Sequence, residues 1–287
     1  MECHSDSDGA SGPNVDGRMR DIFTKKTSLP VDLPVAPPPE AEVYDKRKVK
    51  GTAIIFNHRT FTIDHVSTRD GTDLDRDALQ NVLQELTFDV LVYDDLTLEK
   101  ILEVLSVVSK MNHNECECLI IAVMSHGDEG IVYARDQAYP TKKLWSYFTP
   151  IRCPSLAGKP KMFFIQACRG SESDPGQVVT YVEKDSRPAS SKTYTIPIMA
   201  DIIVMYATVE EYYAWRDPDT GSYFIQALVN QLRKHHQSED LLSILTRVNR
   251  EVAIGFSSFE PNYPKYNNKK EMCSIVSMLT RKYYFNL

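Results

Sequence analysis

The sequence Lys161-Met-Phe-Phe-Ile-Gln-Ala-Cys-Arg-Gly170 runs from apolar residues directly into a cysteine and a glycine. This pattern predicts a short buried strand, with Cys168 just past its carboxyl end. A second run, Cys118-Leu-Ile-Ile-Ala-Val-Met-Ser-His-Gly127, ends in the same way at His126 and Gly127. If both runs are strands of one parallel sheet, their carboxyl ends share the edge where open α/β sheets bind ligands. The two runs therefore predict a thiol and an imidazole that face each other across a crevice.

Strand and helix patterns alternate along the chain. Strands are predicted at residues 49–56, 88–93, 119–124, 161–166, 201–207 and 274–279, and a hairpin at 130–133 and 137–139. Helices with one apolar face are predicted at 74–86, 98–108, 223–235 and 240–253, with a further helix through Trp145. Thr72 or Asp73 is the expected cap of the first helix. This order predicts an α/β fold with a mostly parallel, six-stranded central sheet covered by helices on both faces.

Composition limits the class of protein. The chain has 287 residues, of which 42% are hydrophobic and 25% charged, as in soluble globular proteins. No apolar run approaches the roughly 20 residues of a membrane span, and no secretory signal is visible. The six cysteines lack a disulfide framework, and the net charge of −6 argues against nucleic acid as the main partner. We predict a cytoplasmic protein with free thiols and with no membrane, metal or cofactor requirement.

Gln166-Ala-Cys-Arg-Gly170 matches the signature that surrounds the cysteine of caspases, whose histidine lies upstream. With Ser125-His126-Gly127 added, the chain resembles the caspases from about residue 49 to residue 285, and its short leader resembles the effector branch. The resemblance implies a disordered prodomain at 1–42, a large catalytic subunit at 43–185, an intersubunit linker at 170–197 and a small subunit at 198–287. The linker region is long, polar and poor in apolar residues, as functional or disordered loops are.

The signature assigns chemistry to three residues. Cys168 is the expected nucleophile, and His126 is the expected base toward the thiol and acid toward the leaving amine. As in the family, the N–H groups of Gly127 and Cys168 are expected to bind the oxyanion. A buried structural cysteine and a hydrogen-bonded histidine at a strand end are the alternatives. No third, orienting side chain is visible in the sequence.

Arg69, Gln166 and Arg216 match the caspase pocket that binds an aspartate side chain before the scissile bond. Both arginines follow predicted strand ends on the same edge as Cys168. A guanidinium binds a carboxylate through two parallel hydrogen bonds. Surface salt bridges are the alternative for either arginine alone, and two arginines within family motifs on the same edge argue against it.

Four aromatic residues are expected to line the pockets beyond the aspartate, with core packing as the alternative for each: Tyr213, Trp215, Tyr223 and Phe259. Asp217 and Tyr223 stand where effector caspases usually have asparagine and tryptophan. An ionised Asp217 only accepts hydrogen bonds, so we expect it to disfavour an acidic residue at the fourth position before the cut. In the alternative, Asp217-Pro-Asp-Thr-Gly221 is a turn, and the carboxylate bonds its own backbone.

The resemblance implies a cysteine endopeptidase that cleaves proteins after aspartate and acts in apoptosis. A zymogen cut at Asp185 in the linker and at Asp16 in the leader by an upstream protease is expected. Residues 274–279 form an edge that predicts a homodimer of large and small subunit pairs, and inhibitor-of-apoptosis proteins are candidate partners. A catalytically silent caspase-like decoy or scaffold, and a protease of the wider clan with another primary specificity, are the alternatives.

Overall fold

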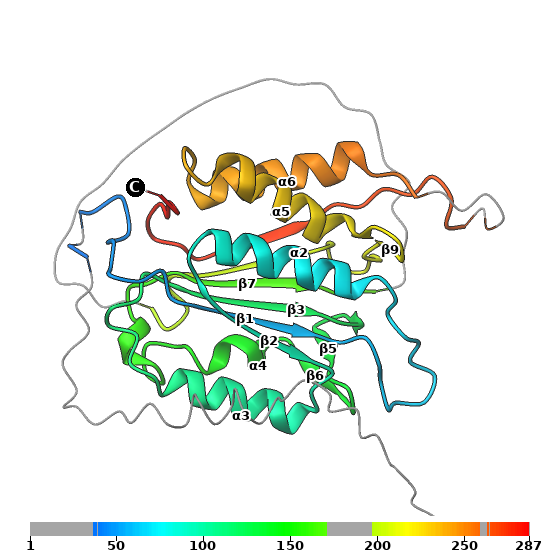
Figure 1. The fold of residues 1–287 in the computed structure, drawn as a ribbon, viewed down its shortest axis with the longest axis horizontal. Helices are drawn as coiled ribbons and strands as arrows, with labels where there is room; N and C mark the ends of the chain where they lie inside the picture. Colours follow the sequence, from blue (N-terminus) through cyan, green and yellow to red (C-terminus); the bar gives the residue numbers. More distant parts are fainter. Residues whose placement is uncertain (1–36, 39, 171–196, 259–262, 264, 287) are drawn as a thin grey trace, which may run out of the picture. The chain divides into compact units, whose positions relative to one another are not determined.

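The computed structural model describes residues 37–38, 40–170, 197–258, 263 and 265–286 (Figure 1). These residues belong to one compact unit that runs from Asp32 to Leu287. The predicted cleavage sites Asp16 and Asp185 and the pocket residue Phe259 lie outside the described residues. No helix among the described residues is long and apolar enough to cross a membrane.

A six-stranded sheet forms the centre of the unit, in the order β11-β8-β7-β3-β1-β2. The strands are β1 (Thr52–Asn57), β2 (Asp89–Asp94), β3 (Leu119–Met124), β7 (Lys161–Gln166), β8 (Ile202–Tyr206) and β11 (Ser274–Ser277). The first five pair in parallel, and β11 pairs antiparallel with β8. The predicted fold class is therefore confirmed. The order reverses at β1, which lies between β2 and β3, so a ligand-binding crevice is expected at the carboxyl ends of β1 and β3.

Helices cover both faces of this sheet (Figure 1). On one face lie α2 (Thr72–Glu85), α5 (Tyr223–His235) and α6 (Leu241–Gly255), and on the other lie α3 (Leu98–Ser109) and α4 (Lys142–Ser146). Alternate strand residues join the core beneath α2, α5 and α6, whereas Phe163 of β7 meets Trp145 of α4 on the opposite face. Four strands, β1, β3, β7 and β8, are buried along their whole length, which explains why they read as nearly continuous apolar runs. Truncating one such side chain to alanine typically costs about 2–5 kcal/mol.

The start of α2 differs from the prediction. Neither Thr72 nor Asp73 caps the helix, because the N-cap is Gly71, in a left-handed conformation (φ 82°) and without a side-chain cap bond. A Cβ at Gly71 would lie 2.7 Å from the backbone oxygen of Asp217, so only glycine fits. Thr72 instead donates its hydroxyl proton to Asn57 Oδ1 (2.7 Å) and accepts a hydrogen bond from Arg69 (2.7 Å). The start of this helix thus holds a predicted site residue.

Short strands flank the carboxyl edge. The predicted hairpin is confirmed as β5 (Ile131–Tyr133) and β6 (Ala138–Pro140), and a preceding strand, β4 (Gly127–Asp128), extends it. A second hairpin, β9 (Arg216–Asp217) with β10 (Gly221–Ser222), was not predicted. A 3-10 turn spans Pro154–Leu156. Both hairpins begin at residues assigned to the site.

The described end of the predicted leader contacts the end of the chain. Glu42 accepts a backbone hydrogen bond from Lys282 (2.8 Å), and Pro38 accepts one from the Arg281 side chain (3.1 Å). Lys46 donates to the backbone oxygen of Tyr284 (2.6 Å). These bonds join residues 38–46 to residues 281–284 near the end of the chain.

Candidate active site

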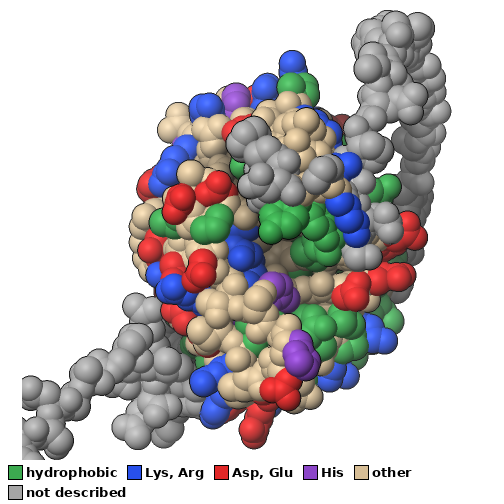
Figure 2. Space-filling model, turned by 90° about the vertical axis from the view of Figure 1, so that its right-hand side faces the viewer, with side chains coloured by type: hydrophobic (Ala, Val, Ile, Leu, Met, Phe, Trp, Pro, Cys, Tyr) green, Lys and Arg blue, Asp and Glu red, His purple; other side chains and the backbone are tan. Residues whose placement is uncertain are grey.

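The two signature strands are neighbours. β3 and β7 pair in parallel up to Met124 and Gln166, and Ser125 then donates its N–H to the Gln166 oxygen (3.0 Å). His126 and Cys168 follow this last pair at the same edge of the sheet. The predicted juxtaposition of the two strand ends is therefore confirmed. Figure 2 faces this edge and shows a hollow bordered by hydrophobic, basic and histidine side chains.

Gly127 lies against the backbone of Cys168. A Cβ at this position would lie 2.8 Å from the Cys168 oxygen, 2.8 Å from the Ala167 Cβ and 2.9 Å from the Ile131 oxygen. The sequence explained this glycine by an unobstructed N–H group. The structure adds a steric reason, because the segment after β7 and strand β5 close on it from two sides.

His126 is oriented by a backbone carbonyl. Its Nε2 lies 2.8 Å from the oxygen of Ser67, and Phe61 packs on the ring at 5.1 Å between centroids. An N–H at Nε2 therefore donates to this carbonyl, which leaves Nδ1 as the acceptor. The sequence showed no orienting side chain, and a backbone oxygen leaves no sequence signal. Burial lowers the pKa of His126, and the Arg69 and Arg216 charges act in the same direction.

Cys168 is half-buried, and its Sγ lies 3.8 Å from the backbone oxygen of Ala214. Burial raises the pKa of this thiol, against the opposing effect of Arg69 and Arg216. These two directions favour a neutral thiol and a neutral imidazole over a thiolate–imidazolium pair. Burial also raises the pKa of Cys118, to about 12, which makes that thiol inert.

Two guanidinium groups lie near the thiol. Arg69 is 1% exposed and donates to the oxygen of His58 (3.0 Å) and to Thr72 Oγ1 (2.7 Å). Burial, aided by the charge of Arg216, lowers the pKa of Arg69 to about 9. Arg216 donates its Nε proton to the oxygen of Asp70 (2.7 Å), and burial lowers its pKa as well. Both cations are thus poorly compensated, which favours an anionic ligand.

Asp75 is a site residue that sequence reasoning missed. This fully buried carboxyl group of α2 accepts hydrogen bonds from the Ser222 N–H (2.9 and 3.0 Å) and from Gln226 Nε2 (2.9 Å). Its charge acts favourably on Arg69 and Arg216. An acidic residue on the apolar face of a predicted helix was the available signal. Asp75 ties α2 to the start of α5 beside the two arginines.

Gln166 ends β7 and is 1% exposed. Its Oε1 is buried and has no hydrogen-bond partner among the described residues. Buried polar atoms are nearly always paired, so an unpaired amide at a strand end is typical of a binding site.

Aromatic rings form a continuous group beside the arginines. Tyr213 and Trp215 contact each other at 6.3 Å, and both contact Tyr266, at 6.1 and 6.4 Å. Trp215 also meets Phe256 at 6.0 Å, and Phe256 meets Tyr223 at 4.2 Å. The structure therefore brings together three of the four predicted aromatic residues, and adds Tyr266 and Phe256, which sequence reasoning missed. These two follow α6 in a polar loop without a periodic pattern.

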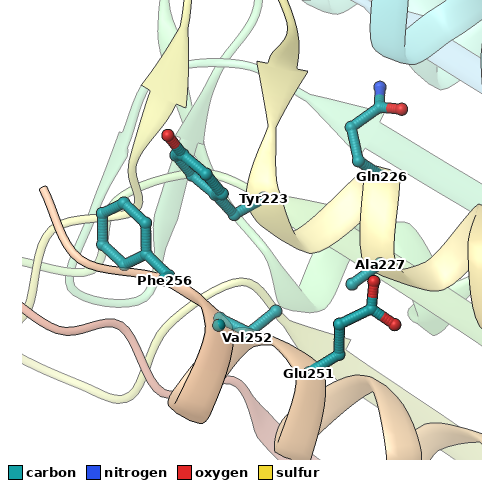
Figure 3. Close-up of a pocket in the computed structure, with 7 residues that line it drawn as sticks. Tyr223, Gln226, Ala227, Glu251, Val252 and Phe256 are labelled. Atoms are coloured by element: carbon teal, nitrogen blue, oxygen red, sulfur yellow. The ribbon is translucent and has the colours of Figure 1, made fainter.

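A cavity of about 210 Å³ adjoins Tyr223 and Phe256 (Figure 3). Its other wall comes from Gln226 and Ala227 of α5 and from Glu251 and Val252 of α6. Both carboxylate oxygens of Glu251 accept hydrogen bonds from the Asn230 amide (2.8 and 3.0 Å), and Gln231 also donates to it. The carboxylate of Glu251 is therefore already hydrogen-bonded by side-chain amides.

Asp217 bonds its own turn. Its Oδ1 accepts the N–H groups of Asp219 (2.8 Å) and Thr220 (3.0 Å). This is the local alternative that the turn sequence indicated. The carboxylate still acts on Tyr223, whose pKa it raises after the larger effect of burial.

The sheet, the Cys–His pair and its surroundings define a cysteine-type peptidase. A family model described as "Caspase domain" matches residues 50–284. The chain is 39% identical over 241 residues to Caspase drICE of Drosophila melanogaster, covering 84% of this chain and 71% of that protein. It is 41% identical over 240 residues to Caspase-3 of Mesocricetus auratus, covering 82% and 83%. The crystal structure of Caspase-1 from Spodoptera frugiperda superposes with a TM-score of 0.81 at 40% identity, covering 88% and 97% of the two chains. This chain belongs to the caspase family, and its relatives are effector caspases.

Proposed function

We propose that this protein is an active endopeptidase that cleaves protein substrates after aspartate. The observation that carries the proposal is the pair of under-compensated guanidinium groups, Arg69 and Arg216, beside the Cys168 thiol. A substrate aspartate supplies the missing negative charge, and each charge-assisted hydrogen bond contributes about 1.5–3 kcal/mol. A neutral side chain leaves both cations unpaired, so discrimination against it reaches about 10⁴-fold.

The neutral resting pair sets the course of the reaction. His126 accepts the Cys168 proton at Nδ1 while its Nε2–H stays on the Ser67 oxygen. The sulfur attacks the backbone carbonyl carbon of the substrate aspartate, and the N–H groups of Gly127 and Cys168 bind the resulting oxyanion. His126 then gives its proton to the leaving amine, and the thioester is hydrolysed by a water that His126 deprotonates.

Maturation by cleavage belongs to the same proposal. An upstream protease, or the enzyme itself, cuts after Asp185, so that the large subunit (43–185) and the small-subunit region (198–287) fall on separate fragments. Val182-Glu-Lys-Asp185-Ser186 has aspartate before the cut and a small residue after it, and Asp16 is the leader site. Intact-mass analysis after activation tests this, and new termini outside 170–197 and the leader would contradict it.

The dimer rests on the sheet edge. β11 has β8 as its strand neighbour among the described residues, and Val276 on β11 and Met272 just before it are exposed. An apolar edge of this kind favours pairing with a second copy about a two-fold axis. We therefore propose a homodimer of large and small subunit pairs that acts in apoptosis in the cytoplasm, with inhibitor-of-apoptosis proteins as further partners. Light scattering of the active enzyme tests the dimer.

The cavity beside Tyr223 and Phe256 supports a preference at the fourth position before the cut. An aliphatic side chain fits a cavity of this size, whereas an acidic one would lie beside the carboxylate of Glu251. We propose that leucine or isoleucine is accepted there at least as well as aspartate.

The deciding experiment profiles the processed protein on a peptide library with Asp, Glu, Asn or Arg fixed before the cut, with Cys168→Ala as the control. We expect hydrolysis of the Asp pool alone, lost in the variant. Equal cleavage of the Asn pool would refute the arginine pocket. Binding of Asp peptides without cleavage would support the silent scaffold instead.

A further inference from the structure

The peptide group between Ala214 and Trp215 lies between the nucleophile and a buried acid. Its carbonyl oxygen is 3.8 Å from Cys168 Sγ, and its N–H donates to Oε2 of Glu271 (3.1 Å). A peptide group is planar and rigid, so it turns as one unit. Any rotation that breaks the contact with Glu271 also moves the oxygen that faces the thiol.

Glu271 is an unusual residue for such a buried place. It is 1% exposed, and its Oε1 has no hydrogen-bond partner among the described residues. None of the ion pairs between described residues includes it. An ionised carboxylate in this environment costs several kcal/mol, so the group is neutral and acts as an uncharged acceptor.

The groups around Glu271 keep it neutral. Burial raises its pKa well above the usual range, and the charge of Asp75 on α2 adds to this effect. The titratable groups that face Glu271 from other segments are Cys168 after β7, Tyr223 on α5 and Cys273 before β11. Arg69 and Arg216 act on Cys168 and Asp75.

The backbone of Glu271 is well fixed. The next residue, Met272, accepts a hydrogen bond from the N–H of Val209 (3.1 Å), so this segment runs beside the one that leads to Trp215. An apolar side chain would avoid the cost of burying a carboxyl group. The hydrogen bond from the Trp215 N–H is an interaction that an apolar side chain at this position could not make.

We propose that Glu271 is a positioning residue for the nucleophile: it holds the Ala214–Trp215 peptide in the orientation that keeps the Ala214 oxygen against the Cys168 thiol. It acts through the peptide and does not touch substrate. The inference rests on the proposed function only in taking Cys168 as the nucleophile. The same contact fixes Trp215, which belongs to the aromatic group of the site.

Three substitutions test the role. Glu271→Gln keeps a neutral acceptor of the same length, Glu271→Leu removes the acceptor, and Glu271→Asp withdraws it by one methylene. We expect the Gln variant to keep kcat within about threefold, and the Leu and Asp variants to lose about 10- to 100-fold in kcat with a smaller change in KM, because small misplacements of reacting groups have effects of this size.

Alkylation by iodoacetamide, read cysteine by cysteine by mass spectrometry, provides a readout that needs no peptidase activity. In the Leu and Asp variants the thiol loses its fixed partner, so Cys168 should react several-fold faster than in wild type and in the Gln variant. The buried Cys118 and Cys153 should react at the wild-type rate, whereas general destabilisation would expose them too.

Each outcome decides the matter. The proposal would be overturned if the Glu271→Asp variant, or a folded Glu271→Leu variant, kept both the wild-type kcat and the wild-type rate of Cys168 alkylation. It would also be overturned if the Glu271→Gln variant behaved like Glu271→Leu. If the Leu variant does not fold, the comparison of Gln with Asp decides. If wild type cleaves no Asp peptide while the alkylation pattern appears as expected, the proposed function fails and the positioning role stands.

Discussion

Gly127→Ala is the most direct perturbation of the catalytic geometry. The new methyl carbon would lie 2.8 Å from both the Cys168 oxygen and the Ala167 Cβ, and 2.9 Å from the Ile131 oxygen, where ordinary contacts begin near 3.4 Å. Two of these atoms are backbone oxygens in different segments, so relief requires a shift of about half an ångström in the loop after β7 or in strand β5. Overpacking of this kind costs about 1–3 kcal/mol of stability.

The expected loss of kcat in Gly127→Ala is much larger than the modest loss of folding stability would suggest. The shift moves the N–H groups of Gly127 and Cys168 away from the position of the oxyanion, and loss of one such donor costs about 10²- to 10³-fold in kcat. The assay is steady-state hydrolysis of a fluorogenic peptide ending in Asp by the processed enzyme, together with a thermal melt. We expect a melting temperature lowered by roughly 2–4 °C per kcal/mol.

Gly130→Ala is the matched control in the same hairpin. Gly130 has a positive φ of 68° and no atom within 4 Å of an added Cβ. Alanine there introduces backbone strain of about 1–2 kcal/mol without a clash. It should therefore lower stability about as much as Gly127→Ala and leave kcat unchanged. If Gly127→Ala keeps kcat within threefold, or Gly130→Ala loses as much, the steric account of Gly127 is refuted.

Three further outcomes are expected. Arg69→Ala and Arg216→Ala should each lower kcat/KM for Asp peptides by at least about 100-fold, since each removes charge-assisted bonds of about 1.5–3 kcal/mol; equal loss on a peptide without Asp would contradict this. Burial lowers the pKa of His126 below its ordinary 6.5, so the imidazole stays neutral on acidification and kcat/KM should fall only below pH 6.5. The pKa of Arg69 is about 9, so kcat/KM should also fall above about pH 9, where this guanidinium loses its charge. Tyr223→Trp should fill part of the neighbouring cavity and lower the preference for leucine over aspartate at the fourth position by about 10-fold, measured with paired tetrapeptides; an unchanged ratio would exclude the cavity as that subsite.

The sequence by itself determined the sheet and the juxtaposition of Cys168 and His126. Buried parallel strands read as unbroken apolar runs because both faces are covered, and each run ends where a polar turn begins. The run before Gln166 and the run before Ser125 therefore showed where each strand stops. Parallel pairing then brought Cys168 and His126 to one edge, since all carboxyl ends meet there. A local signal was sufficient, because strand ends are set by local chain chemistry.

Contacts made by backbone groups, and contacts between segments far apart in the sequence, became visible only in the tertiary structure. The Ser67 carbonyl that orients His126 and the peptide between Cys168 and Glu271 belong to backbone groups, which every residue carries. The N-cap of α2 is Gly71 and not the predicted Thr72, because the turn at Asp217, far along the chain, leaves no room for a Cβ at this position. These contacts are set by which segments the folded chain brings within a few ångströms of each other, and residue type at one position does not encode that distance.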